Sequence, residues 1–143
     1  MPVIQLPGTP DLLGLHAANP LRYPYLLQTL GCSGWDILFA FPGQSQIFPS
    51  DLTGQEKTFF SALDEEWVNT VRPSDQDVAG LPFHGGWFVY LGYELLHQLE
   101  PSVAVRQQAN EFPLAALTRI PAAIMVDHTE GQTYLFAEDA CSH

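Results

Sequence analysis

The sequence predicts an α+β domain: a mixed, largely antiparallel sheet with helices packed on one side, ending in a β-hairpin. Strand-like and helix-like segments follow one another without the strict β-α-β order of a parallel sheet. Two strand-like segments near the end, 122–127 and 132–137, are separated by a short turn that contains Gly131. The 12 prolines and 11 glycines interrupt the chain often, so we expect short elements.

The chain is expected to begin with a strand at 3–6 and a short helix. Thr9 is a suitable N-cap residue and Pro10 suits the first helical position, where its missing N–H costs nothing. The Asn19-Pro20 pair then ends the helix, because a proline disfavours helical conformation in the residue before it.

Two strands are expected next, at 25–30 and 35–41, joined by a glycine turn. Both faces of the second strand are mostly apolar, which is typical of a central strand covered on both sides. Residues 46–48 are expected to form a short edge strand.

A long helix is expected from 53 to about 72. Thr53 and Glu56 have the spacing of a capping box. One stripe of this helix is apolar, with spacing typical of a core-facing side: Phe59, Leu63 and Trp67. Adjacent acidic residues are expected to face water: Asp64, Glu65 and Glu66.

The most apolar and aromatic stretch runs from 81 to 100. It predicts a buried, central strand at 85–91, interrupted by Gly92, and a short helix at 93–99. Its glycines are expected where the backbone approaches a neighbour closely. A further strand is expected at 114–118, and polar loops at 73–80 and 102–112.

The charge excludes two classes of partner. The net charge is −11, from 16 acidic and 5 basic residues, and the basic residues are scattered. A nucleic-acid partner or an anionic membrane requires clustered cations, so neither is expected. Cys32 and Cys141 are far apart and fit unpaired thiols in a reducing cytoplasm. The length of 143 residues suits a single domain, 1–143, without a signal peptide or an apolar span of membrane length.

No catalytic constellation is evident. The histidines form no metal-ligand pair, so no metal site is expected. No cofactor is expected in this chain either. Gly85-Gly86 precedes a strand, whereas glycines that bind phosphate follow a strand and open a helix. Glu94 follows the apolar strand, and either helix capping or a ligand role would explain it.

The 81–100 stretch also carries a family signature, Pro-Phe-x-Gly-Gly-(apolar)-Gly-Tyr-(Asp/Glu). The matching residues are Pro82, Phe83, Gly85, Gly86, Gly92, Tyr93 and Glu94. This pattern resembles the N-terminal region of the chorismate-using anthranilate and aminodeoxychorismate synthases. It is most similar to aminodeoxychorismate (para-aminobenzoate) synthase component I. Segments 25–29, 35–42 and 121–128 resemble further strands of that region, in the same order, so the similarity covers nearly the whole chain.

The resemblance implies the N-terminal half of the chorismate-utilising synthase fold. In that family, component I is a transferase of para-aminobenzoate and folate biosynthesis. It converts chorismate and ammonia, supplied by glutamine amidotransferase component II, to 4-amino-4-deoxychorismate with magnesium. The family's catalytic residues lie in a C-terminal chorismate-binding domain, which is expected to be absent from residues 1–143. The resemblance therefore implies a structural or regulatory part, without catalytic residues and inactive alone.

The resemblance also implies a candidate ligand pocket. The family's Leu-Leu-Glu-Ser strand contributes to a tryptophan pocket, and Gln28 and Thr29 stand at the Glu and Ser positions. Trp35 stands where an Arg is usual. The three are candidate ligand contacts, and ordinary strand residues are the other interpretation. Two alternative functions are a stand-alone module that binds tryptophan or a related small aromatic ligand, and an interaction protein with an exposed apolar face.

Overall fold

The computed structural model describes residues 3–49, 58–70, 80–100, 102 and 112–138. They form an α+β structure with mostly antiparallel sheets, which confirms the expected fold class. The expectation of one sheet was wrong, because the strands form a five-stranded and a three-stranded sheet. The chain divides into two compact units. Unit 1 comprises Met1–Gly43, Arg72–Gly86 and Arg119–His143, and unit 2 comprises Gln44–Val71 and Trp87–Thr118.

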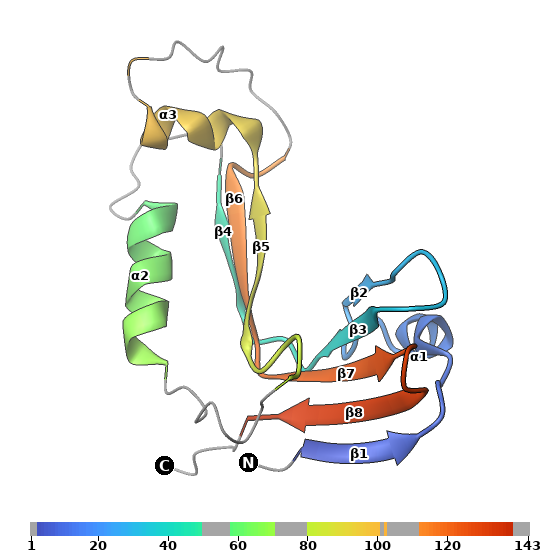
Figure 1. Ribbon diagram of the computed structural model, residues 1–143. Helices are drawn as coiled ribbons and strands as arrows, with labels where there is room; N and C mark the ends of the chain where they lie inside the picture. Colours follow the sequence, from blue (N-terminus) through green and yellow to red (C-terminus); the bar gives the residue numbers. More distant parts are fainter. Residues whose placement is uncertain (1–2, 50–57, 71–79, 101, 103–111, 139–143) are drawn as a thin grey trace. The chain divides into compact units, whose positions relative to one another are not determined.

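Unit 1 contains the five-stranded sheet, in the order β1-β8-β7-β3-β2 (Figure 1). All of its paired strands are antiparallel, and β7 and β8 form the expected hairpin. The bounds are β1 Val3–Pro7, β2 Tyr25–Leu27, β3 Trp35–Ala40, β7 Ala122–Asp127 and β8 Gln132–Ala137. As expected, β3 lies inside the sheet and is largely buried.

The register gives the two faces of this sheet different neighbours. On one face, Ile37 pairs with Met125, and their apolar cluster includes Phe83. On the other face, Leu38 pairs with Ile124 and packs with Leu12 of helix α1, Leu12–Ala18. Both faces of β3 are therefore covered along much of the strand.

Three element ends in unit 1 differ from expectation. Asp11 is the N-cap of α1 in place of Thr9, because its side chain accepts a hydrogen bond from Gly14 N at 2.9 Å. Pro10 consequently lies before the helix. β2 ends at Leu27, and the amide of Thr29 donates to a side chain instead of a strand. β3 ends at Ala40, since Phe41 has a positive φ of 55°.

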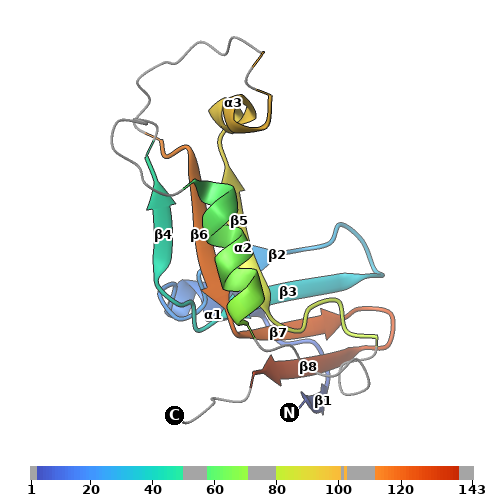
Figure 2. The same ribbon diagram turned by 90° about the vertical axis from the view of Figure 1, so that its left-hand side faces the viewer.

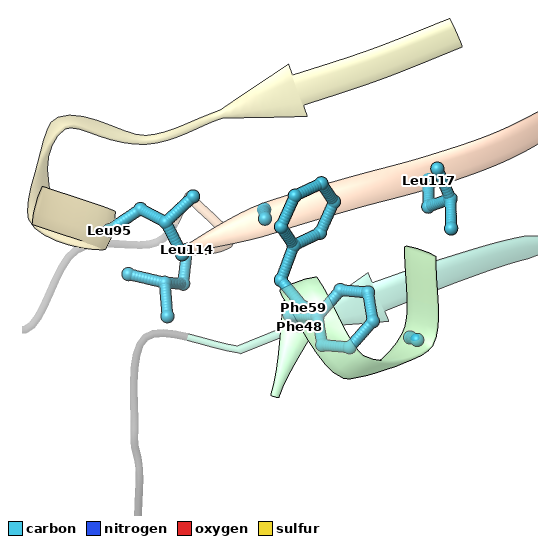
Figure 3. Packing of buried hydrophobic residues seen from close by; sticks show 7 residues of the cluster. Phe48, Phe59, Leu95, Leu114 and Leu117 are labelled. Carbon is cyan, nitrogen blue, oxygen red and sulfur yellow. The ribbon is translucent and has the colours of Figure 1, made fainter. Parts of the chain in front are cut away.

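Unit 2 contains most of the three-stranded sheet, in the order β4-β6-β5, and helix α2 lies against one side of it (Figure 2). The bounds are β4 Ser45–Phe48, β5 Gly86–Leu91, β6 Ala115–Ile120 and α2 Phe59–Asn69. Phe59 is 1% exposed and packs edge-to-face on Phe48 at a centroid distance of 5.6 Å. Figure 3 shows this core with Leu95, Leu114 and Leu117 around the two rings. β4 is an edge strand, as expected.

The first residue of helix α2, and the residues that it buries against the sheet, differ from expectation. Its N-cap is Thr58, whose hydroxyl accepts from Ser61 N at 3.2 Å, whereas the expected capping box at 53–56 lies outside the described residues. The helix ends at Asn69. Phe59 and Ala62 are buried against the sheet, but Trp67 is 51% exposed and stacks beside Trp87. Glu66 is half-buried and accepts a hydrogen bond from Gln46 at 2.8 Å, so its expected exposure was wrong.

The aromatic strand β5 is an edge strand, which corrects the expectation of a buried, central one. Its first residues are half-buried, whereas Val89, Tyr90 and Leu91 are exposed. The chain then forms a 3-10 turn, Tyr93–Leu95, and a single α-helical turn, α3 Leu96–Leu99, in place of one regular helix.

The other expected segments are placed as follows. β6 includes all but the first residue of the expected 114–118 strand and extends to Ile120. The loops at 73–80 and 102–112, and the end of the chain, lie largely outside the described residues. Within the part of the chain that the structure describes, no helix is long and apolar enough to cross a membrane.

Candidate functional site

A polar cluster in unit 1 is built around Asp36, which is only 7% exposed. Its Oδ1 accepts a hydrogen bond from the amide of Thr29 at 2.8 Å. Its Oδ2 lies 3.0 Å from Nε2 of His128. The amide of His128 also donates to the carbonyl of Gly34 at 3.0 Å. The loop before β3 and the turn after β7 are therefore joined through one carboxylate.

The register explains why these residues meet. Trp35 pairs with Asp127 across β3 and β7, so His128 is the first residue beyond the ladder and lies opposite Gly34. The chain can turn there because Oδ1 of Asp127 accepts hydrogen bonds from the amides of Thr129 and Glu130. Asp36 lies two residues after Gly34 and therefore on the same face of the sheet as His128, which brings its carboxylate within reach of the imidazole.

The surroundings of Asp36 lower the pKa of its carboxyl group below its ordinary value. Burial is the largest single influence and by itself raises this pKa, because it penalises the charged form. The hydrogen bond from Thr29, the hydrogen bond and charge of His128, and a hydrogen bond with Gln28 together outweigh burial. Asp36 is therefore an ionised carboxylate at neutral pH.

This arrangement forms a clamp between two loops. Oδ1 of Asp36 accepts from the amide of Thr29, and Oδ2 lies beside the imidazole of His128, so both oxygens are used to join the two segments. A carboxylate beside an imidazole also has the geometry that orients a catalytic base. Within the described ranges, no three His, Cys, Asp or Glu side chains are grouped so that they could hold a metal ion.

The three candidate ligand contacts separate in the structure. Gln28 and Thr29 both lie beside Asp36. Trp35 belongs to the opposite face of the sheet, where its ring lies 5.6 Å from that of Tyr134. Sequence reasoning therefore found two members of the polar cluster and missed Asp36 and His128. The strand alternation and the hairpin register could have found both, since together they place position 128 beside position 34.

The family-signature residues are divided between the two units. Pro82, Phe83, Gly85 and Gly86 belong to unit 1, whereas Gly92, Tyr93 and Glu94 belong to unit 2. The ring of Phe83 packs edge-to-face on Phe39, with centroids 5.0 Å apart. Pro82 and Tyr93 are exposed, and Glu94 is half-buried in the 3-10 turn.

Two signature glycines have physical reasons to be glycine. Gly85 has a φ of 93°, and a Cβ there would collide with the carboxylate of Glu138. A Cβ on Gly92 would lie 2.9 Å from the carbonyl oxygen of Leu114, to which the Gly92 amide donates at 2.8 Å. Both are packing residues, in agreement with the expectation that glycines mark close backbone approach.

An ion pair that sequence reasoning missed lies beside this signature. Arg119 forms a salt bridge with Glu138, and both side chains are about four-fifths buried. The same guanidinium donates to the carbonyl oxygens of Gly86 and Ile120. Arg119 thus connects the start of β5, the end of β6 and the residue after β8.

A scan against protein-family models finds no match to this chain, and a search of curated proteins finds no significant relative.

Proposed function

We propose that this chain is the N-terminal, structural or regulatory part of a chorismate-using synthase of the aminodeoxychorismate synthase component I type. The complete enzyme converts chorismate and glutamine-derived ammonia to 4-amino-4-deoxychorismate for para-aminobenzoate and folate synthesis in the cytoplasm. Its magnesium and catalytic residues belong to the chorismate-binding domain, and its ammonia comes from the amidotransferase. The chain by itself does not catalyse this reaction.

The observation that carries the proposal is the signature in 81–100, supported by its local geometry. Gly85 and Gly92 each stand where a side chain would collide with another part of the same unit. The signature thus consists partly of residues that this fold requires for steric reasons. The segments 25–29, 35–42 and 121–128 supply the other matches, in the family's order. They coincide with β2, β3 and β7, which are neighbours in one sheet.

An exposed apolar surface on unit 2 supports a partner domain. Val89, Tyr90 and Leu91 are 38%, 42% and 55% exposed at the end of the edge strand β5. Tyr93, which follows directly, is 79% exposed. Val89 and Leu91 share one side of the strand and Tyr90 lies on the other, because successive strand residues point to opposite sides. Exposed apolar side chains at the edge of a sheet are typical of protein-binding surfaces. In the proposed enzyme, the chorismate-binding domain covers this surface, which we call the β5 surface.

The test is reconstitution of activity from two pieces. With chorismate, ammonium and magnesium, the chain alone is expected to form no 4-amino-4-deoxychorismate. The isolated chorismate-binding domain of an aminodeoxychorismate synthase is expected to gain activity when this chain is added. Product from the chain alone, or no effect on the isolated domain at saturating chain, contradicts the proposal.

A matched pair of variants locates the interface. Leu91→Glu places a charge on the β5 surface and is expected to reduce the gain in activity. Val68→Glu places the same charge on an 80% exposed apolar residue of α2, in the same unit, and is expected to leave the gain intact. Equal loss in both variants contradicts the β5 surface as the interface.

Calorimetry with tryptophan, using Thr29→Ala as the control, separately tests the alternative that the chain is a tryptophan-binding module.

A further inference from the structure

A hollow lies on the α1 side of the five-stranded sheet, within unit 1. The register places Ala40, Ala122 and Ala137 in one row across β3, β7 and β8. In the adjacent row, Leu38 and Ile124 pack with Leu12 of α1. The alanine side chains reach less far from the sheet than the leucine and isoleucine of the neighbouring row. A hollow of about 250 Å³ results beside the part of the sheet that α1 covers.

Two aromatic residues form a wall of the hollow. Tyr23 and Phe41 both line it, and their rings meet edge-to-face with centroids 6.3 Å apart. Phe41 has a φ of 55°, a conformation that bulky residues rarely adopt. The amide of Phe41 donates to the carbonyl of Arg22 at 2.8 Å, which helps to hold this conformation. Backbone strain of this kind often accompanies a ligand site.

The hollow has a positively charged group beside its aromatic wall. The guanidinium carbon of Arg22 lies 5.2 Å above the ring centroid of Phe41, in cation–π geometry. Arg22 is exposed and forms no ion pair with a described residue, although the chain carries a net charge of −11. None of the residues that line the hollow is acidic. Arg22 is not itself a lining residue, but an anion beside Phe41 would meet its charge without a competing carboxylate from the lining.

We propose that this hollow binds a small apolar carboxylate about the size of one ring. The alanine row accepts the apolar ring, Tyr23 and Phe41 flank it, and the Arg22 guanidinium pairs with the carboxylate. Sites for drug-sized ligands have volumes of about 300–1,000 Å³, so a hollow of about 250 Å³ suits a smaller molecule. The site is separate from the Asp36 cluster and does not depend on the proposed function.

The first test is binding measured by calorimetry and by amide chemical shifts in NMR, with phenylacetate as the probe. Phenylacetate is expected to saturate one site and to shift the amides of Ala122 and Ala137. 2-Phenylethanol, which has the same ring without the charge, is expected to bind at least about tenfold more weakly, because a charge-assisted hydrogen bond is lost. Cyclohexylacetate compares an aliphatic ring with an aromatic one. Binding of cyclohexylacetate within about tenfold of phenylacetate supports an apolar carboxylate site, because it keeps both the ring and the charge.

Variants separate the charge from the shape of the hollow. Arg22→Gln is expected to weaken phenylacetate binding about tenfold, while Arg22→Lys keeps the preference for phenylacetate over 2-phenylethanol. Ala137→Leu fills the hollow and is expected to abolish binding. Ala17→Leu makes the same change at an exposed position of α1 and is expected to have no effect. Circular dichroism confirms that each variant is folded.

Three results would overturn the proposal. The first is no saturable binding of either ring carboxylate to the folded chain. The second is equal affinity for phenylacetate and 2-phenylethanol. The third is unchanged binding by a folded Ala137→Leu variant. Because every measurement uses the isolated chain, these results are independent of the reconstitution test for the proposed function.

Discussion

Nε2 of His128 lies 3.0 Å from Oδ2 of Asp36 and joins the turn after β7 to strand β3. The pKa of Asp36 is lowered in the folded chain, so folding favours its ionised form. The resulting stability is fully present above the unfolded pKa, near 3.8, and is lost as the pH falls through the folded value. We expect the free energy of unfolding, measured in urea, to decrease as the pH falls below about 4.

The variant Asp36→Asn isolates this contribution. An amide can still accept from Thr29 but carries no charge, so the variant is expected to lose about 1–2 kcal/mol at pH 7. It is also expected to show a smaller loss in acid than the wild type. Asp64→Asn, at an exposed position of α2, is the control and is expected to change neither quantity. Identical acid profiles for Asp36→Asn and the wild type would contradict the clamp.

Gly85 and Gly8 form a matched pair for testing a steric requirement. Both have a positive φ, 93° and 90°, but a Cβ on Gly8 meets nothing within 4 Å. Gly8→Ala is therefore expected to cost only the backbone strain, about 1 kcal/mol. Gly85→Ala introduces the same strain and also displaces Glu138, so its melting temperature is expected to be lower than that of Gly8→Ala. Equal melting temperatures would show that Glu138 moves aside at no cost.

Arg119 and Glu138 are expected to act as a unit. Arg119→Met removes the donor for Glu138 and for the carbonyl of Gly86, and it is expected to cost about 1–3 kcal/mol in free energy of unfolding. Glu138→Gln leaves an acceptor and should cost less. In a double-mutant cycle, the two losses are expected to sum to more than the loss in the double variant. Strict additivity would mean that the pair contributes no coupling energy.

Phe59 anchors the core of unit 2. It is 1% exposed and contacts the rings of both Phe48 and Phe60. Phe59→Ala is expected to destabilise the chain by about 3–5 kcal/mol, through lost burial and the cavity left behind. Phe112→Ala removes the same ring from a 71% exposed position and is expected to change stability by less than about 0.5 kcal/mol. Denaturant unfolding followed by circular dichroism measures both.

Local pattern was sufficient to find most strands of the sheet in unit 1. Runs of mostly apolar residues located β3 and β7, and the glycine turn located the β7–β8 hairpin with its correct bounds. Helix starts were less predictable, because several residues near each start can serve as caps. Asp11 and Thr58 are caps because of the hydrogen bonds that they form, whereas Thr9 also had a suitable side chain.

The candidate site was only half predictable. Gln28 and Thr29 were found through a resemblance of strands, but the resemblance did not say what they contact. Their partner Asp36 is near in sequence, whereas His128 is 92 residues further along the chain, and only strand pairing brings it close. Trp35 was grouped with Gln28 and Thr29, but strand alternation places it on the opposite face from Asp36.

The sequence by itself determined the α+β class and the strands β3, β7 and β8. It also determined that the backbone of the 81–100 stretch approaches its neighbours closely at Gly85 and Gly92. These properties depend on residues close together in the chain, through side-chain alternation, turn geometry and steric freedom. Only the tertiary structure decided that there are two sheets, that the apolar strand β5 lies at an edge, and that Asp36 meets His128. These depend on which strands pair, and strand pairing is set by the packing of residues far apart in the sequence, which local pattern does not encode.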